Sequence, residues 1–285
     1  MCTRSCAERR SSVEKKRHCT RRVKKSRGAI RCFGHVNNDA AVRDAVRAML
    51  HSDQKTAAIT VVDDFLEKSL ASACASLCRD SLAPLTVSLG QRDIGRDDSL
   101  FIFALPDAGK SDADDDATLR HPTYGSMTAD RLVPLIRVSR QLLSLSNVLT
   151  EEFGYAISAP RQLQLARYGG SAESIGYARH LDNTIDHGDT TALAGPSGQR
   201  ICDRAVTAIV YLDGSCDGGE FCVYSQHTNS TEEEACRIVD PRAGRLVLFP
   251  SRVVEHAVLP VISGERWALS AWFTHIYEQR DPPHL

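Results

Sequence analysis

Hydrophobic and polar positions divide the chain into a helical half and a strand-rich half. Residues 37–51, 67–82 and 132–153 place apolar side chains three or four positions apart, which predicts three amphipathic helices. Thr128 is the expected N-cap of the third helix, and Pro134 in its second turn favours a start nearer Val133. Residues 59–66 begin as a buried strand, and strands at 84–87 and 99–104 flank a polar loop.

After Tyr155 the pattern changes to short apolar runs separated by Gly, Pro and Asp turns. The expected strands cover residues 162–168, 205–212, 221–224, 237–239, 245–249, 255–261 and 266–274. Many short strands at regular spacing are typical of a β-sandwich or jelly roll. The sequence therefore predicts an α+β fold, with supporting helices over about 37–155 and a jelly-roll core over about 156–276.

Charge singles out the N-terminus. The chain has 285 residues, 42% of them hydrophobic, and a net charge of −1, yet residues 1–33 hold twelve Lys or Arg and two Glu. Dense like charge predicts a disordered basic arm over residues 1–36, followed by one domain over 37–285. The arm could be an idle tail, a nuclear-import signal or nucleic-acid contact, or a mitochondrial signal. Its candidate zinc ligands are Cys2, Cys6, His18, Cys19 and Cys32.

Ten cysteines without a recognisable secretory signal favour reduced thiols, and hence the cytoplasm or nucleus. No apolar run approaches the roughly 20 residues that span a bilayer, so we expect no membrane contact.

The candidate chemistry lies in His180-x-Asp182, a downstream His256, and Arg266. Two imidazoles and one carboxylate are the ligand set of the facial triad associated with non-haem Fe(II). At a strand end, residues two apart share a face, so His180 and Asp182 need only a neighbouring strand to supply His256. Zinc could use the same ligands, but zinc does not explain a guanidinium at the expected start of an apolar strand, which calls for a bound anion.

These residues resemble the 2-oxoglutarate-dependent Fe(II) dioxygenases, and within them the prolyl 4-hydroxylases of the EGL-nine type that hydroxylate hypoxia-inducible factor. The segments that carry the resemblance are 59–66, 93–97, 166–183, 206–212, 218–221 and 266–272, so the likeness runs from about residue 40 to 276. It implies a double-stranded β-helix core. Residues 183–203 and 106–122 are longer than in the animal enzymes, and Arg266 lies one residue further from His256.

The resemblance implies a role for each candidate residue. His180, Asp182 and His256 would hold Fe(II), and Arg266 would bind the 5-carboxylate of 2-oxoglutarate. Three further residues would line the cofactor pocket: Tyr211, Tyr168 and Ser270. Arg204 and Trp272 would face the peptide substrate, and residues 88–98 would fold over it.

The activity implied by the resemblance is O2-dependent 4-hydroxylation of a prolyl residue, assisted by ascorbate. The substrate would be a hypoxia-type transcription factor, which would make the protein an oxygen sensor, or a Skp-family adaptor. Two rivals stay open: the same fold acting on a ribosomal protein, a lysine or a nucleobase, or a catalytically silent metal-binding interaction module.

Overall fold

The described part of the chain comprises residues 39–51, 59–82, 87–88, 99–104, 129–160, 162–169, 174–183, 201–224 and 235–276 of a computed structural model. All of these residues belong to one compact unit, Gly34–Leu285. The predicted basic arm, the polar loop at 89–98, Thr128, and the long segments at 106–122 and 184–200 lie outside the described residues.

Helices precede most of the strands, as the patterns predict. The helical elements are α1 (Asp39–His51), α2 (Lys68–Leu77), the π-helical turn η1 (Cys78–Leu82) and α3 (Ala129–Phe153). The strands are β1 (Thr60–Val62), β2 (Val87–Ser88), β3 (Ser99–Ala104), β4 (Ile157–Ser158), β5 (Gln162–Gly169), β6 (Tyr177–His180), β7 (Ile201–Asp213), β8 (Cys216–Gly218), β9 (Phe221–Tyr224), β10 (Ala235–Val239), β11 (Leu246–Pro250), β12 (His256–Val258) and β13 (Val261–Ile276).

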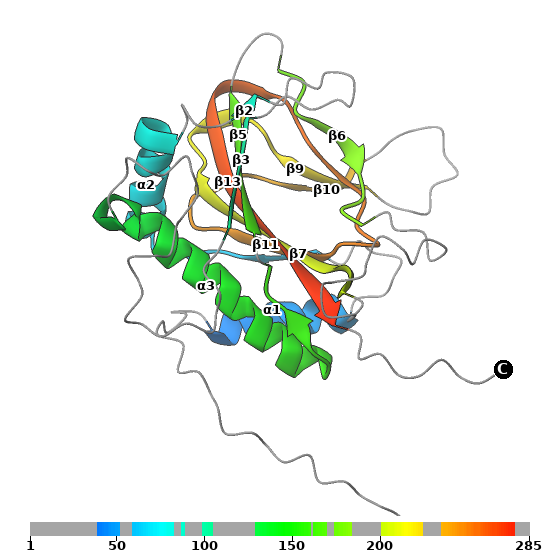
Figure 1. Ribbon diagram of the computed structural model, residues 1–285. Coiled ribbons are helices and arrows are strands. Elements are labelled where there is room, and N and C mark those ends of the chain that lie inside the picture. Colours follow the sequence, from blue (N-terminus) through cyan, green and yellow to red (C-terminus); the bar gives the residue numbers. More distant parts are fainter. Residues whose placement is uncertain are drawn as a thin grey trace, which may run out of the picture. The chain divides into compact units, whose positions relative to one another are not determined.

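Two antiparallel sheets form the core. The larger sheet follows the order β1-β11-β7-β13-β5-β3-β2, with β4 and β8 also paired to β13, and the smaller one follows β10-β9-β12-β6. The three helices lie on one side of the larger sheet, and the smaller sheet lies on the other side (Figure 1). This arrangement confirms the predicted α+β fold with a double-stranded β-helix core supported by helices.

The long central strands bury both of their faces. On β7, Ala208 and Val210 pack toward the helices, whereas Ile209 and Tyr211 pack toward the smaller sheet. Strands β11 and β13 alternate in the same way, because successive side chains of a strand point to opposite faces. This two-sided burial explains the near-continuous apolar composition of these segments and fixes which positions face the space between the sheets.

Helix α3 begins at Ala129, the residue after the expected N-cap position, and the shift of its start toward Val133 suggested by Pro134 does not occur. A proline removes one backbone hydrogen bond and crowds the carbonyl four residues earlier. Here that loss falls near the N-terminal end of the helix. The buried stripe of Leu132, Leu135 and Val138 extends on both sides of the proline, so packing outweighs it.

Two strand predictions also need correction. The run 255–261 is two strands, β12 and the start of β13, separated by Leu259 and Pro260. Proline cannot donate to a sheet ladder, which accounts for the break. As a result Arg266 lies inside β13 rather than at its start. The short strands β4 and β8 have no sequence counterpart because two or three residues cannot show a period.

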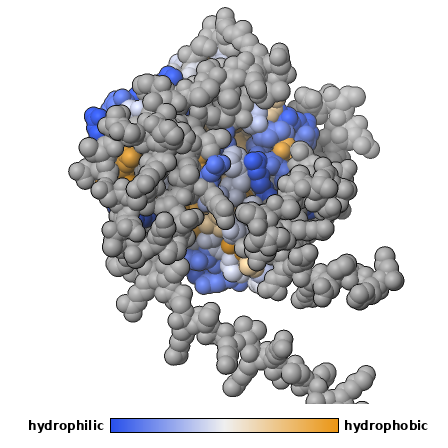
Figure 2. Space-filling model, viewed as in Figure 1, coloured by the Kyte–Doolittle hydropathy of each residue, from blue (hydrophilic) through white to orange (hydrophobic). Residues whose placement is uncertain are grey.

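The described surface on the face in Figure 2 is mainly hydrophilic, with single apolar residues scattered over it. Among the described helices, none combines the length and apolar character needed to cross a bilayer.

Candidate metal centre

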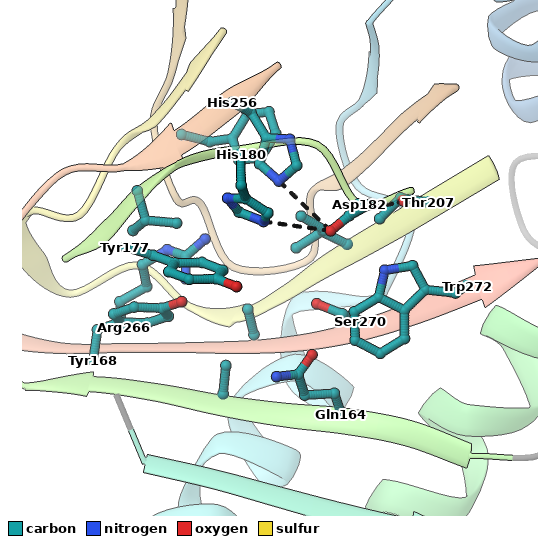
Figure 3. Close-up of a pocket in the computed structure, with 15 residues that line it drawn as sticks. Gln164, Tyr168, Tyr177, His180, Asp182, Thr207, His256, Arg266, Ser270 and Trp272 are labelled. Carbon is teal, nitrogen blue, oxygen red and sulfur yellow. Dashed lines mark hydrogen bonds and ion pairs between the residues drawn. The ribbon is translucent and has the colours of Figure 1, made fainter. Parts of the chain in front are cut away.

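Strand pairing brings His180, Asp182 and His256 together. His180 ends β6, and its Cα pairs in register with His256, the first residue of β12. Asp182 follows in the bend after β6, and its Oδ1 lies 3.4 Å from His180 Nε2 and 3.9 Å from His256 Nε2. Ligand atoms of the three residues all lie within 4.8 Å of one another. Figure 3 shows the three side chains converging on one point above the pocket.

The hydrogen bonds of the two imidazoles identify which nitrogen is available to a metal. His180 Nδ1 lies 2.9 Å from the carbonyl of Ala178, and His256 Nδ1 lies 3.1 Å from that of Val254. Because a carbonyl only accepts, each Nδ1 must carry the proton, and a neutral ring then directs an unprotonated Nε2 toward Asp182. Two nitrogen lone pairs and a carboxylate oxygen that face one another need a cation between them.

The pKa values support this state. Burial lowers the pKa of His256 to about 4, although the charge of Asp182 acts in the opposite direction. Burial also raises the pKa of Asp182, but the neighbouring His180 and His256 rings and the hydrogen bond donated by Thr207 outweigh that effect and bring the pKa to about 2. At neutral pH the site therefore holds a neutral imidazole at His256 and an ionised carboxylate, the forms that bind metal.

Two hydroxyl groups orient the carboxylate, and nothing in the sequence singled them out. Thr207 on β7 donates to Asp182 Oδ2 at 2.7 Å, and its hydroxyl also lies 2.8 Å from Ser251 Oγ. Arg204 Nη1 donates to the backbone carbonyl of Asp182 at 3.1 Å. In a sequence, a threonine within an apolar strand indicates only β propensity. Its contact with Asp182 depends on strand register, which is set by non-local contacts.

Replacing Thr207 with valine is expected to weaken metal binding by about tenfold, because groups that hold a ligating carboxylate typically contribute that much or more. The shape and β-branching of the residue are kept, so the strand should be unaffected. A Co(II) titration followed by visible absorbance measures the effect. Thr207→Ser should bind as the wild type does, and Ser251→Ala should change affinity less than Thr207→Val. Equal affinity in Thr207→Val would show that the hydroxyl does not orient the ligand.

Arg266 is buried without a counter-charge. Its side chain is among the largest fully buried ones, yet its Nε has no hydrogen-bond partner, and no carboxylate among the described residues pairs with it. Its Nη2 donates to the Tyr211 hydroxyl at 3.5 Å, and its guanidinium lies 4.8 Å from the Tyr168 ring centre and 4.9 Å from that of Tyr211. A buried guanidinium in aromatic surroundings requires an anion to offset its desolvation.

Space for that guanidinium depends on Gly219. A Cβ at this position would lie 3.1 Å from Arg266 Cδ, and the backbone φ of +74° is one that side-chain-bearing residues rarely adopt. The turn before β9 therefore has to be glycine if the arginine is to lie flat against it.

The remaining predicted site residues fall into two groups. Tyr168, Ser270 and Trp272 line the pocket beside the triad and Arg266. Tyr211 and Arg204 do not line it: Tyr211 lies behind Arg266, and the Arg204 guanidinium stacks 4.1 Å from the Trp272 ring centre. The other lining residues, which sequence reasoning did not single out, are Gln164, Ala166, Tyr177, Thr207, Ile209, Phe221, Val258 and Ala268. Of these, Tyr177 places its ring centre 4.1 Å from that of His180.

The donor set fits Fe(II) and 2-oxoglutarate. Three ligands on one side leave coordination positions free for a chelating co-substrate, as a facial triad does. The pocket continues from the triad to an uncompensated guanidinium, where a second carboxylate has a matching partner. Zinc would account for the triad alone, but leaves the orphaned arginine unexplained.

Residues 163–274 match the 2OG-Fe(II) oxygenase superfamily and form a 2OG-Fe(II) oxygenase domain. Members of this superfamily use Fe(II) and 2-oxoglutarate, and the described His-Asp-His cluster lies inside the matched range. The resemblance predicted from the sequence is thereby confirmed at the level of the superfamily, while the EGL-nine type of specificity stays a prediction.

Curated relatives match just over a third of the chain. Human prolyl 3-hydroxylase 1 is 34% identical over 107 residues, which cover 37% of this chain and 13% of that protein. A PKHD-type hydroxylase of Shewanella baltica is 33% identical over 106 residues, or 37% of this chain and 39% of that protein. The chain therefore matches well under half the length of either relative.

Solved structures show the fold over a longer range. A prolyl 4-hydroxylase of Pseudomonas putida is 22% identical with a TM-score of 0.53, covering 83% of this chain and 98% of that one. A Trichoplax adhaerens prolyl hydroxylase in complex with a peptide of hypoxia-inducible factor is 20% identical with a TM-score of 0.56, covering 83% and 90%. The α-ketoglutarate-dependent epimerase SnoN is 17% identical with a TM-score of 0.51, covering 83% of each chain. Because this fold also serves an epimerase, it does not by itself select the reaction.

Proposed function

We propose that this protein is a peptidyl-proline hydroxylase that uses Fe(II), 2-oxoglutarate and O2 and acts at C4 of the ring, with ascorbate keeping the metal ferrous. The observation that carries the proposal is Arg266, buried without a carboxylate partner among the described residues, at the end of a pocket that opens onto the His180, Asp182 and His256 cluster. Prolyl hydroxylases recur among the related sequences and structures, and one of those structures holds a peptide.

The pocket residues have separate roles in the proposed reaction. When bound, Fe(II) and 2-oxoglutarate would activate O2 for C–H hydroxylation, with one oxygen atom of O2 going to the substrate carbon and the other to succinate as CO2 is released. Arg266 holds the distal carboxylate of the co-substrate and so fixes its distance from the triad. Apolar walls from Ile209, Phe221 and Val258 keep water out of the space beside the triad.

A second candidate is hydroxylation at C3. The curated relatives of human, rat and mouse origin are prolyl 3-hydroxylases, 33–34% identical to this chain over 107 residues. The ring carbon that reacts depends on how the peptide lies over the pocket. Residue types at the metal do not settle the choice between C3 and C4.

Succinate formation by the purified protein with Fe(II), 2-oxoglutarate and ascorbate tests the proposal, with and without a panel of proline-containing peptides. We expect peptide-dependent succinate, a gain of one oxygen on proline, and 4-hydroxyproline rather than 3-hydroxyproline after acid hydrolysis. An oxygen gain on lysine or another residue would overturn the prolyl assignment while keeping the oxygenase. Purified protein that loads metal and 2-oxoglutarate but forms no succinate would favour a silent module.

The proposal also covers the protein substrate and the cellular role. A hypoxia-type transcription factor would make the protein an oxygen sensor, and a Skp-family adaptor is the other expected target. Both require a compartment with reduced thiols, in line with the cysteines at Cys74, Cys78, Cys216 and Cys222 that are free in the described structure.

A further inference from the structure

One end of the pocket holds hydrogen-bonding groups that the metal centre does not use. Gln164 on β5 is only 8% exposed, and its side chain points into the pocket (Figure 3). Its Cα pairs in register with that of Ser270 on β13, which also lines the pocket. Trp272 lies two residues further along the same face of β13, and its Nε1 is buried without a partner.

Strand register sets this end apart from the arginine end. The pocket face of β13 carries Arg266, Ala268, Ser270 and Trp272 in alternation, and the same face of β5 carries Tyr168, Ala166 and Gln164. Arg266 pairs with Tyr168, Ala268 with Ala166, and Ser270 with Gln164, so a polar row, a small apolar row and a second polar row follow one another. At ~3.3 Å per residue, the backbones of Arg266 and Ser270 are roughly 13 Å apart.

None of the three groups in this second row has a hydrogen-bond partner among the described residues. Of the three, the Trp272 Nε1 is a fully buried atom without a partner, which is uncommon because its desolvation is left uncompensated. An indole N–H only donates, and the amide of Gln164 and the hydroxyl of Ser270 each donate and accept. The ligand that satisfies all three must therefore offer at least one strong acceptor.

We propose that Gln164, with Ser270 and the Trp272 indole, forms a subsite for a main-chain carbonyl of the substrate and thereby positions the residue to be hydroxylated. The inference rests on the proposed function, which brings a peptide to this pocket. A prolyl residue has no amide hydrogen, so the peptide group that precedes its ring offers a carbonyl acceptor and no donor. The Trp272 indole N–H, which can only donate, suits that carbonyl. Gln164 is then a specificity-determining residue.

Gln164→Met tests the subsite, because it keeps side-chain length and removes both hydrogen-bonding functions. Gln141→Met is a matched control: Gln141 on α3 also has a buried carbonyl oxygen without a partner, but it lies outside the pocket. The probe is the proline-containing peptide that the wild-type protein modifies best. Its affinity is measured by fluorescence anisotropy on Zn(II)-loaded protein, so binding is read without turnover.

We expect Gln164→Met to weaken peptide binding and raise the KM for peptide by about tenfold, as the loss of one or two hydrogen bonds implies. The KM for 2-oxoglutarate should stay within about twofold, and less hydroxylated peptide should form per succinate because the target is held less firmly. Gln141→Met should match the wild type in each measurement. A melting temperature for Gln164→Met equal to or above that of the wild type would separate this from unfolding.

The results that would contradict the subsite differ from those that would contradict the proposed function. Unchanged peptide affinity and product yield would overturn the subsite, and a raised KM for 2-oxoglutarate alone would assign Gln164 to the co-substrate. If the preferred peptide is modified on a residue other than proline, the prolyl assignment fails, while loss of affinity in Gln164→Met still supports the subsite. A wild-type protein that binds no peptide of the panel would overturn both proposals.

Discussion

Replacing His256 with alanine is expected to abolish succinate formation and metal loading while the protein stays folded. His256 supplies one of the three converging ligand atoms, and no other histidine among the described residues lies near enough to substitute for it. A pocket with only His180 and Asp182 cannot hold a metal in the facial arrangement, so activity falls with occupancy rather than with a rate constant. Co(II) absorbance and succinate yield measure the two losses.

Fold integrity is the companion measurement. The His256 ring packs against both Phe221 and Phe249, with ring centres 4.9 Å away in each case, so its removal leaves a small cavity. Truncations of this kind cost about 1–3 kcal/mol, which lowers the melting temperature without unfolding a domain of this size. His275→Ala is the control, since His275 is part-buried on β13 outside the pocket and should retain both metal and activity. Wild-type succinate yield in His256→Ala would refute the assigned centre.

Replacing Arg266 with methionine is expected to have effects of opposite sign on function and stability. A bidentate guanidinium–carboxylate pair in a buried site is worth several charge-assisted hydrogen bonds, so the KM for 2-oxoglutarate should rise by about a hundredfold. Arg266→Lys keeps the charge but not the fork geometry, so its KM for 2-oxoglutarate should lie between those of the wild type and Arg266→Met. In the absence of 2-oxoglutarate the methionine variant should melt at a higher temperature than the wild type. It no longer buries an uncompensated charge.

Arg245 provides the matched control for that reversal. It is also buried, but its guanidinium donates to Asp63 from Nε at 2.6 Å and from Nη2 at 3.1 Å. Arg245→Met should therefore lower the melting temperature, because it breaks a pair made within the chain and also the bond to the Asp240 carbonyl. In protein already loaded with metal, adding 2-oxoglutarate should raise the melting temperature of wild type and Arg245→Met, but much less that of Arg266→Met. An unchanged KM for 2-oxoglutarate in Arg266→Met would place the carboxylate elsewhere.

Local patterns were sufficient for most of the fold. The three helices follow from apolar residues at helical spacing, and the long strands β5, β7 and β13 follow from short apolar runs between turns. The secondary-structure predictions failed where tertiary packing outweighed a local sequence preference. Pro134 favoured a helix start nearer Val133, but α3 begins at Ala129 and packs against the sheet on both sides of the proline. The strand β6 has a mostly exposed, polar pattern, and was anticipated only through the resemblance of the ligand turn.

By itself the sequence determined the chemistry available to this protein: two histidines and an aspartate at ligand spacing, and an arginine within an apolar strand. Those are properties of residue type and spacing, which local physics controls. The tertiary structure alone decided three further points: that Thr207 and Ser251 stand behind Asp182, that no carboxylate among the described residues pairs with Arg266, and that Gln164 faces the pocket beside Ser270. Each depends on the register of strands far apart in sequence. Register is set by the summed packing of both sheet faces, which no local pattern encodes.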